Sequence, residues 1–70
     1  NRDLDDALDV YNSVLRIDDE SSEAFKGKAY TYFDLKDFKT AAYFFGKASH
    51  VGSLDEASQK IWNVCKEKLN

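Results

Sequence analysis

Apolar residues recur at helical spacing along most of the chain. Within residues 3–17 they stand mostly three or four positions apart, at Leu4, Ala7, Leu8, Val10, Tyr11, Val14, Leu15 and Ile17. This period predicts an α-helix. The apolar arc is wider than the single stripe of a surface helix, so we expect this helix to need cover on two sides.

A second helix is expected over residues 22–34. The polar cluster at residues 18–22 ends the first helix, and Ser21 or Ser22 suits the N-cap of the second because a serine hydroxyl can accept a free backbone N–H. A short turn at residues 34–37 follows, and Asp37 is the expected N-cap of a third helix that reaches about residue 50.

The last helix is expected over residues 54–69. Gly52 stands where a left-handed residue commonly ends a helix. Ser53 and Glu56 then have the spacing of a capping box, which marks a helix start. No stretch alternates with period two, so the predicted fold class is all-α, with about four helices and short antiparallel connections.

A stretch from residue 25 to residue 45 holds eight of the ten aromatic residues, interleaved with four lysines. Three interpretations compete at this stage: a helical core, an exposed groove that binds a protein, and stacking platforms for nucleic acid. The acidic balance of residues 1–23, with eight acids against two arginines, argues against nucleic acid. Residues 24–70 carry eight lysines against five acids, which is weak for a phosphate-backbone binder.

The chain repeats itself at a distance of 34 residues. A shift of that length places the first helix on the third in the pairs Leu4–Phe38, Ala7–Ala41, Leu8–Ala42, Tyr11–Phe45, Val14–Ala48 and Ile17–Val51. In most of these pairs a large residue meets a large one or a small residue meets a small one. A helix–turn–helix unit of 34 residues is the period of the tetratricopeptide repeat (TPR), and the chain resembles that family.

The aromatic and small residues carry the resemblance. Phe25 and Tyr32 stand at the family's aromatic positions, and Ala29 and Ala41 stand where two helices approach closely. The resemblance implies that the core seam is made by Phe25, Tyr32, Phe38 and Phe45. The chain departs from the family's pattern where it has Lys28, Lys36 and Ser53 in place of an apolar residue, glycine and proline.

The resemblance also implies how the chain is divided. All of residues 1–70 form one TPR-type segment of an α-solenoid. Residues 2–19 are the second helix of a preceding repeat, residues 22–53 are a complete repeat, and residues 54–70 are a capping helix. The missing half-repeat and the absence of methionine lead us to expect a piece of a longer protein.

A finer resemblance is to the TPR region of fungal co-chaperones of TPR–CS–SGS architecture. It rests on Lys36-Asp37-Phe38, Phe44-Phe45, Lys47-Ala48, Gly52, Asp55, Trp62 and Lys68-Leu69-Asn70. It implies a scaffold or adaptor that works with chaperone machinery, with a Skp-type ubiquitin-ligase adaptor as partner, and that self-associates.

The family's concave surface implies a partner-binding groove. In this chain its lining is Glu23, Lys26, Tyr30, Phe33 and Asp34. A peptide or helix is the expected partner, with two aromatic anchors beside a lysine. Equally open is that Tyr30 and Phe33 only cover a neighbouring helix. The family's carboxylate clamp is not expected, because Tyr30 stands where that motif has asparagine.

The alternative function is self-association through the first helix. Its wide apolar arc would be buried against another copy by Leu4, Leu8, Tyr11 and Leu15. Catalysis has little support, because His50 has no carboxylate or nucleophile at helical spacing and Cys65 lies on an apolar face. No enzyme activity, metal or cofactor is therefore expected.

The cysteine count and the length of the apolar runs indicate in which cellular compartment the protein is expected. One cysteine and no secretory segment indicate a reducing compartment, the cytoplasm or the nucleus. No apolar run approaches the roughly 20 residues of a membrane span, so no membrane role is expected.

Overall fold

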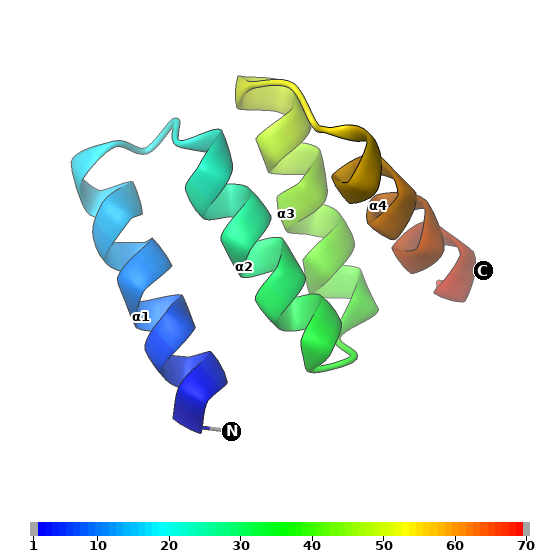
Figure 1. Ribbon diagram of the computed structural model, residues 1–70, viewed down its shortest axis with the longest axis horizontal. Coiled ribbons are helices and arrows are strands. Elements are labelled where there is room, and N and C mark those ends of the chain that lie inside the picture. The colour runs from blue at the N-terminus through cyan, green and yellow to red at the C-terminus, as the bar shows by residue number, and fades with distance from the viewer. Residues whose placement is uncertain (1, 70) are drawn as a thin grey trace.

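The computed structural model describes the backbone of residues 2–69 and the side chains of residues 4–69. Four helices follow one another: α1 (Arg2–Ile17), α2 (Ser22–Asp34), α3 (Phe38–Val51) and α4 (Glu56–Lys68). Consecutive helices run antiparallel (Figure 1). The predicted all-α class and the four helices are confirmed.

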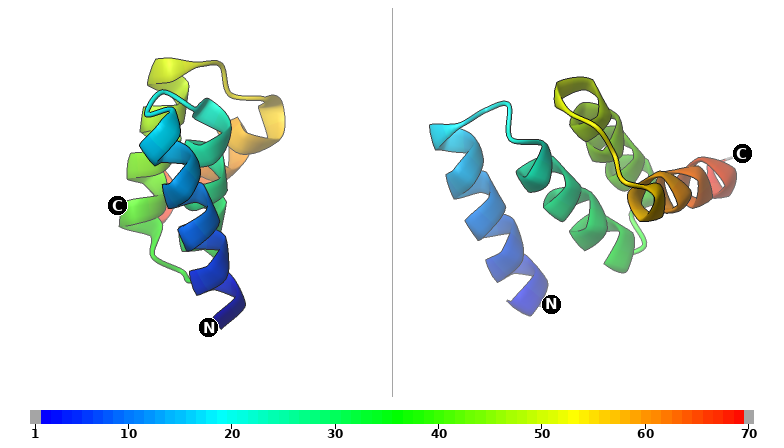
Figure 2. Two further views of the ribbon diagram at one scale, coloured as in Figure 1. Left: turned by 90° about the vertical axis from the view of Figure 1, so that its left-hand side faces the viewer. Right: turned by 45° about the horizontal axis from the view of Figure 1, so that its top comes forward.

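Each helix packs on its neighbour in the chain. The most extensive interface joins α2 and α3, with smaller ones between α1 and α2 and between α3 and α4. The Cα trace measures 33 × 28 × 17 Å, and two further views show α1 and α4 at opposite ends of the row (Figure 2). Among the described helices, α1 and α4 therefore each have one face on which no other helix packs.

The core lies where α2, α3 and α4 meet. Ala29 and Ala41 are fully buried and let the backbones of α2 and α3 approach closely, and Phe45 and Cys65 fill the space beside them. Phe25 is buried as expected, whereas Tyr32 and Phe38 are only partly buried. Phe44 stacks on Phe25 and Tyr32 and so joins α3 to α2.

The helix starts follow from side-chain caps. Ser21 accepts the N–H of Ala24 at 3.2 Å, and Asp37 accepts that of Thr40 at 3.3 Å, as the sequence predicted. The expected start of the last helix was wrong, because Asp55 rather than Ser53 caps α4. The first helix ends at Ile17, directly before the polar cluster that was expected to end it.

Two backbone conformations differ from those expected. Gly52 has φ −163° and ψ −168°, which is extended backbone and not the left-handed conformation we predicted. The left-handed residue is Lys36, with φ 63°, in the turn between α2 and α3. Its N–H donates to the carbonyl oxygen of Phe33 at 2.9 Å. Glycine would adopt this conformation without steric cost.

Candidate interaction surfaces

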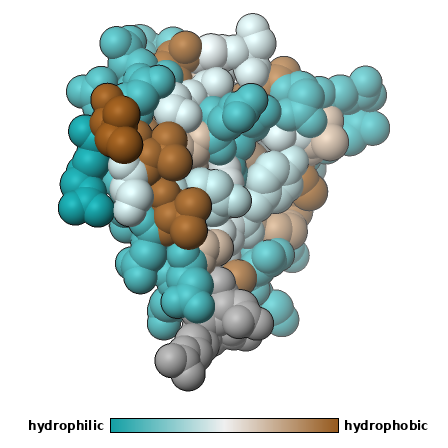
Figure 3. Space-filling view, turned by 60° about the vertical axis from the view of Figure 1, so that its left-hand side comes forward, coloured by the Kyte–Doolittle hydropathy of each residue, from teal (hydrophilic) through white to brown (hydrophobic). Residues whose placement is uncertain are grey.

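An apolar stripe lies exposed on α1. Val10, Val14 and Ile17 are spaced four and three residues apart, which places them on one face of the helix. They are 60%, 39% and 91% exposed. Figure 3 shows hydrophobic side chains in a line over this side of the molecule, between hydrophilic ones. We call these three residues the α1 stripe.

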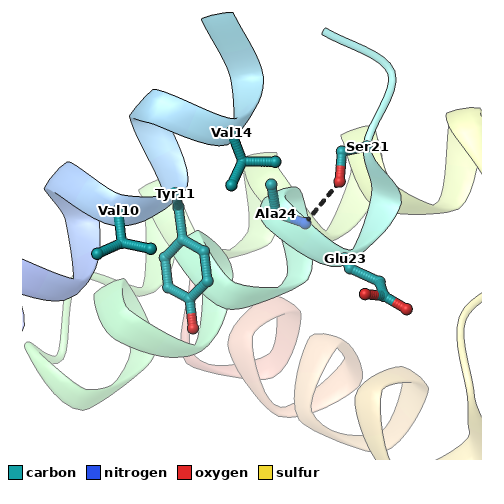
Figure 4. Close-up of a pocket in the computed structure, with 6 residues that line it drawn as sticks. All are labelled: Val10, Tyr11, Val14, Ser21, Glu23 and Ala24. Carbon is teal, nitrogen blue, oxygen red and sulfur yellow. Dashed lines mark hydrogen bonds between the residues drawn. The ribbon is translucent and has the colours of Figure 1, made fainter. Parts of the chain in front are cut away.

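A groove between α1 and the start of α2 adjoins the α1 stripe. Its lining residues are Val10, Tyr11, Val14, Ser21, Glu23 and Ala24 (Figure 4). The hydroxyl of Ser21 is occupied by its cap bond to Ala24. The groove therefore presents apolar walls, and Glu23 is its one charged lining residue.

Tyr11 forms the inner wall of this groove because Gly27 on α2 makes room for it. A Cβ at position 27 would overlap the ring of Tyr11, so only glycine allows the ring to lie this close. Lys28 adds a second tie between the helices, since its Nζ donates to Oδ1 of Asn12 at 2.7 Å. The same ammonium lies 4.4 Å from the centre of the Phe44 ring, and its partial burial lowers the pKa of Lys28.

The residues predicted for self-association are not the most exposed ones on α1. Leu4, Leu8, Tyr11 and Leu15 are all half-buried, and Tyr11 lies against Gly27 of the same chain. The three residues of the α1 stripe are among the apolar positions noted in the sequence, but the pattern alone did not identify them as the exposed face. The width of the apolar arc was the signal that two faces, not one, need cover.

Lys26 and Tyr30, two residues of the predicted groove, contact α4. The Tyr30 hydroxyl lies 2.9 Å from Oγ of Ser58, which in turn donates to Oδ1 of Asp55 at 2.6 Å. Because the Ser58 proton is committed to the carboxylate, Tyr30 is the donor in its own bond. Lys26 forms a salt bridge to the same carboxylate, with its Nζ 3.6 Å from Oδ1 of Asp55. We call these four residues the α2–α4 latch.

The α2–α4 latch stabilises the ionised form of the Asp55 carboxyl group. The hydrogen bond from Ser58 lowers the pKa of Asp55 most, and Lys26 lowers it further. Ser58 itself is buried and fully hydrogen-bonded. Its surroundings are those of a residue that holds two helices together, and its oxygen is not open to a substrate.

Phe33 and Asp34 lie in a separate cleft at the other end of α2. The cleft is lined by Phe33, Asp34, Lys36, Phe38 and Lys68. The rings of Phe33 and Phe38 meet edge to face with centres 5.7 Å apart, and Lys68 lies over the Phe38 ring. With Glu23 beside α1, the structure divides the five predicted groove residues among three places. Their role in binding a partner stays a prediction.

Cys65 and His50 are the two residues that the sequence offered for chemistry. Cys65 is buried in the core, and burial raises the pKa of its thiol, so the reactive thiolate is disfavoured. His50 is exposed in the last turn of α3. Among the residues that the structure describes, no three His, Cys, Asp or Glu side chains are placed to hold a metal ion. Within the same part of the chain, no helix is long and apolar enough to cross a membrane.

Comparison with known proteins adds no relative. The chain matches no family model, no curated protein and no solved structure.

Proposed function

We propose that this chain is a non-catalytic protein–protein interaction module, a TPR-type helical segment that binds its partner through the α1 stripe and the adjoining groove. The observation that supports this most is the exposure of the α1 stripe on an end helix of the row. Apolar side chains that gather on one face, rather than singly, mark interaction sites.

The opposite end of the row supports the proposal by contrast. The exposed residues of α4 are mainly polar or charged, among them Glu56, Lys60, Asn63 and Glu67. Lys66 extends over the Trp62 ring at 4.2 Å and covers part of the largest apolar side chain of this helix. A helical row that ends in solvent needs a polar outer face. The α4 end has such a polar outer face. The α1 end does not, because the α1 stripe is exposed there, and this supports a partner-binding role for it.

An adaptor role of the kind implied by the co-chaperone resemblance would use such a face. Self-association through the α1 stripe is the alternative. The latch leaves less room for the predicted groove, because Lys26 and Tyr30 already contact α4.

Affinity capture with a matched pair of variants tests the proposal. Ile17→Ser removes the most exposed apolar side chain of the α1 stripe, and Leu69→Ser removes an exposed leucine just after α4. Both changes are at the surface and should alter stability by no more than about 0.5 kcal/mol. Proteins held by the wild type and by Leu69→Ser should be lost with Ile17→Ser. If both variants hold the same proteins, or if the wild type holds none, the proposal is wrong.

A further inference from the structure

The shape of the α1 stripe fits one kind of partner element. From Val10 to Ile17 it runs two turns along the helix axis, about 10 Å at 1.5 Å per residue. The groove lined by Tyr11 and Ala24 continues it toward α2. A straight apolar ridge beside a shallow groove is complementary to the apolar face of another helix, which offers anchors at every third or fourth residue.

The charge around the α1 stripe is strongly negative. Residues 4–23 contain seven acids and one arginine, and all seven acids are exposed. Asp6 lies one helical turn before Val10, and Glu23 lines the groove on the side of α2. The one arginine, Arg16, donates to the hydroxyl of Ser13 at 3.2 Å. The acids 18–20 follow Ile17 directly in the chain.

This charge distribution selects among the possible occupants. A second copy would bring two acidic borders together, and like charges facing each other across an interface cost affinity. Three exposed apolar side chains are also few for an obligate homodimer, whose interface usually buries more than about 2,000 Å² in total. Nucleic acid would be repelled by the same acids.

We propose that the occupant is an amphipathic helix of a partner protein whose apolar stripe is bordered by lysine or arginine. This inference rests on the proposed function and adds the chemistry of the partner to it. The partner's apolar side chains lie against Val14 and Ile17. Its basic side chains face Asp6 at the N-terminal end of the α1 stripe and Glu23 beside the groove.

Two synthetic peptides test the proposal on the wild-type chain. Both have the same leucine stripe at helical spacing over about four turns, and they differ only in having lysine or glutamate beside that stripe. Fluorescence anisotropy of the labelled peptides gives their affinities. The lysine peptide should bind at least about tenfold more tightly than the glutamate peptide at low salt. Its advantage should shrink as ionic strength rises to about 0.5 M, because salt screens exposed charges.

Single charge reversals show which acidic residues cause the preference for the lysine peptide. Asp6→Lys and Glu23→Lys should each weaken the lysine peptide and strengthen the glutamate peptide by a few-fold. Glu67→Lys on α4 makes the same change in net charge far from α1 and should leave both affinities unchanged. Circular dichroism confirms that each variant keeps its helices, and Asp6→Asn and Glu23→Gln give the same test with smaller changes.

The remaining outcomes show whether the basic partner alone is wrong or the proposed function as well. Equal binding of both peptides, lost with Ile17→Ser, would overturn the basic partner while the proposed function stands. Loss of peptide binding through Glu67→Lys as well would also overturn it, because net charge alone would then explain the preference. If neither peptide binds while affinity capture still depends on Ile17, the partner is not a basic helix. If capture is also insensitive to Ile17→Ser, the proposed function fails too.

Discussion

Lys36 has a backbone conformation that its side chain disfavours. Its φ of 63° lets the chain turn from α2 into α3, and its N–H is satisfied by the carbonyl of Phe33. An L-residue with a Cβ pays about 1–2 kcal/mol for this left-handed conformation. The two helices on either side of the turn pack on each other around buried residues, Ala29 and Ala41 among them, and this packing holds the turn.

Replacing Lys36 by glycine should therefore stabilise the protein. We expect Lys36→Gly to raise the free energy of unfolding by about 0.5–1 kcal/mol, because relief of the steric cost exceeds the extra entropy of glycine in the unfolded chain. Lys60→Gly is the control, since Lys60 is an exposed lysine within α4 and the change there should cost about 1 kcal/mol. Urea unfolding measures both. A Lys36→Gly variant as unstable as Lys60→Gly would contradict the account.

Helix α4 is joined to the rest of the fold by polar contacts as well as by its apolar face. The α2–α4 latch places the capping carboxylate of Asp55 within reach of Lys26, and it joins Ser58 in the first turn of α4 to Tyr30. The Tyr30 ring also packs edge to face on Phe45. These contacts set where α4 begins.

The charge of Asp55 should make this connection sensitive to pH. The pKa of Asp55 is lowered in the folded protein from its ordinary value of 3.8. The stabilisation is therefore present above pH 3.8 and is lost as pH falls through the lower folded pKa. Asp55→Asn keeps a side chain that can cap a helix but removes the charge. Its melting temperature should lie below that of the wild type at neutral pH, and the gap should close in acid. A gap independent of pH would show that the charge does not contribute.

The helices themselves could be predicted from sequence, but two of their details could not. Ser53 with Glu56 and Asp55 with Ser58 both have a spacing suited to a helix start, and they overlap. In the structure Asp55 is the N-cap, and it also forms a salt bridge with Lys26 on α2. Likewise, α1 has two apolar stripes, and Gly27 on α2 decides which one is covered by accepting the Tyr11 ring. Such choices depend on contacts between helices, which a pattern along one helix does not contain.

At the scale of the whole molecule, the two ends of the helical row differ. The α4 end presents mainly polar side chains, and the α1 end presents the α1 stripe within an acidic border. The chain carries a net charge of −3, and its negative charge gathers at the end where the apolar surface lies. This combination favours a partner of opposite charge over a second copy.

The isolated chain should accordingly be a monomer. We expect a mass of 8.0 kDa by light scattering at low salt and micromolar concentration, because the acidic borders of two copies repel each other. Ile17→Ser serves as the comparison and should give the same mass. A dimer in the wild type that becomes a monomer in Ile17→Ser would instead favour self-association through the α1 stripe.

A nuclear magnetic resonance titration tests the central claim most directly, because it shows which residues a partner touches. The lysine-bordered peptide is added to the ¹⁵N-labelled chain, and the shifts of the backbone amide signals are followed. Binding at the α1 end predicts the largest shifts at Val10, Val14, Ile17 and Glu23. Shifts centred on Lys26, Tyr30 and Phe33, or no shifts at all, would contradict it.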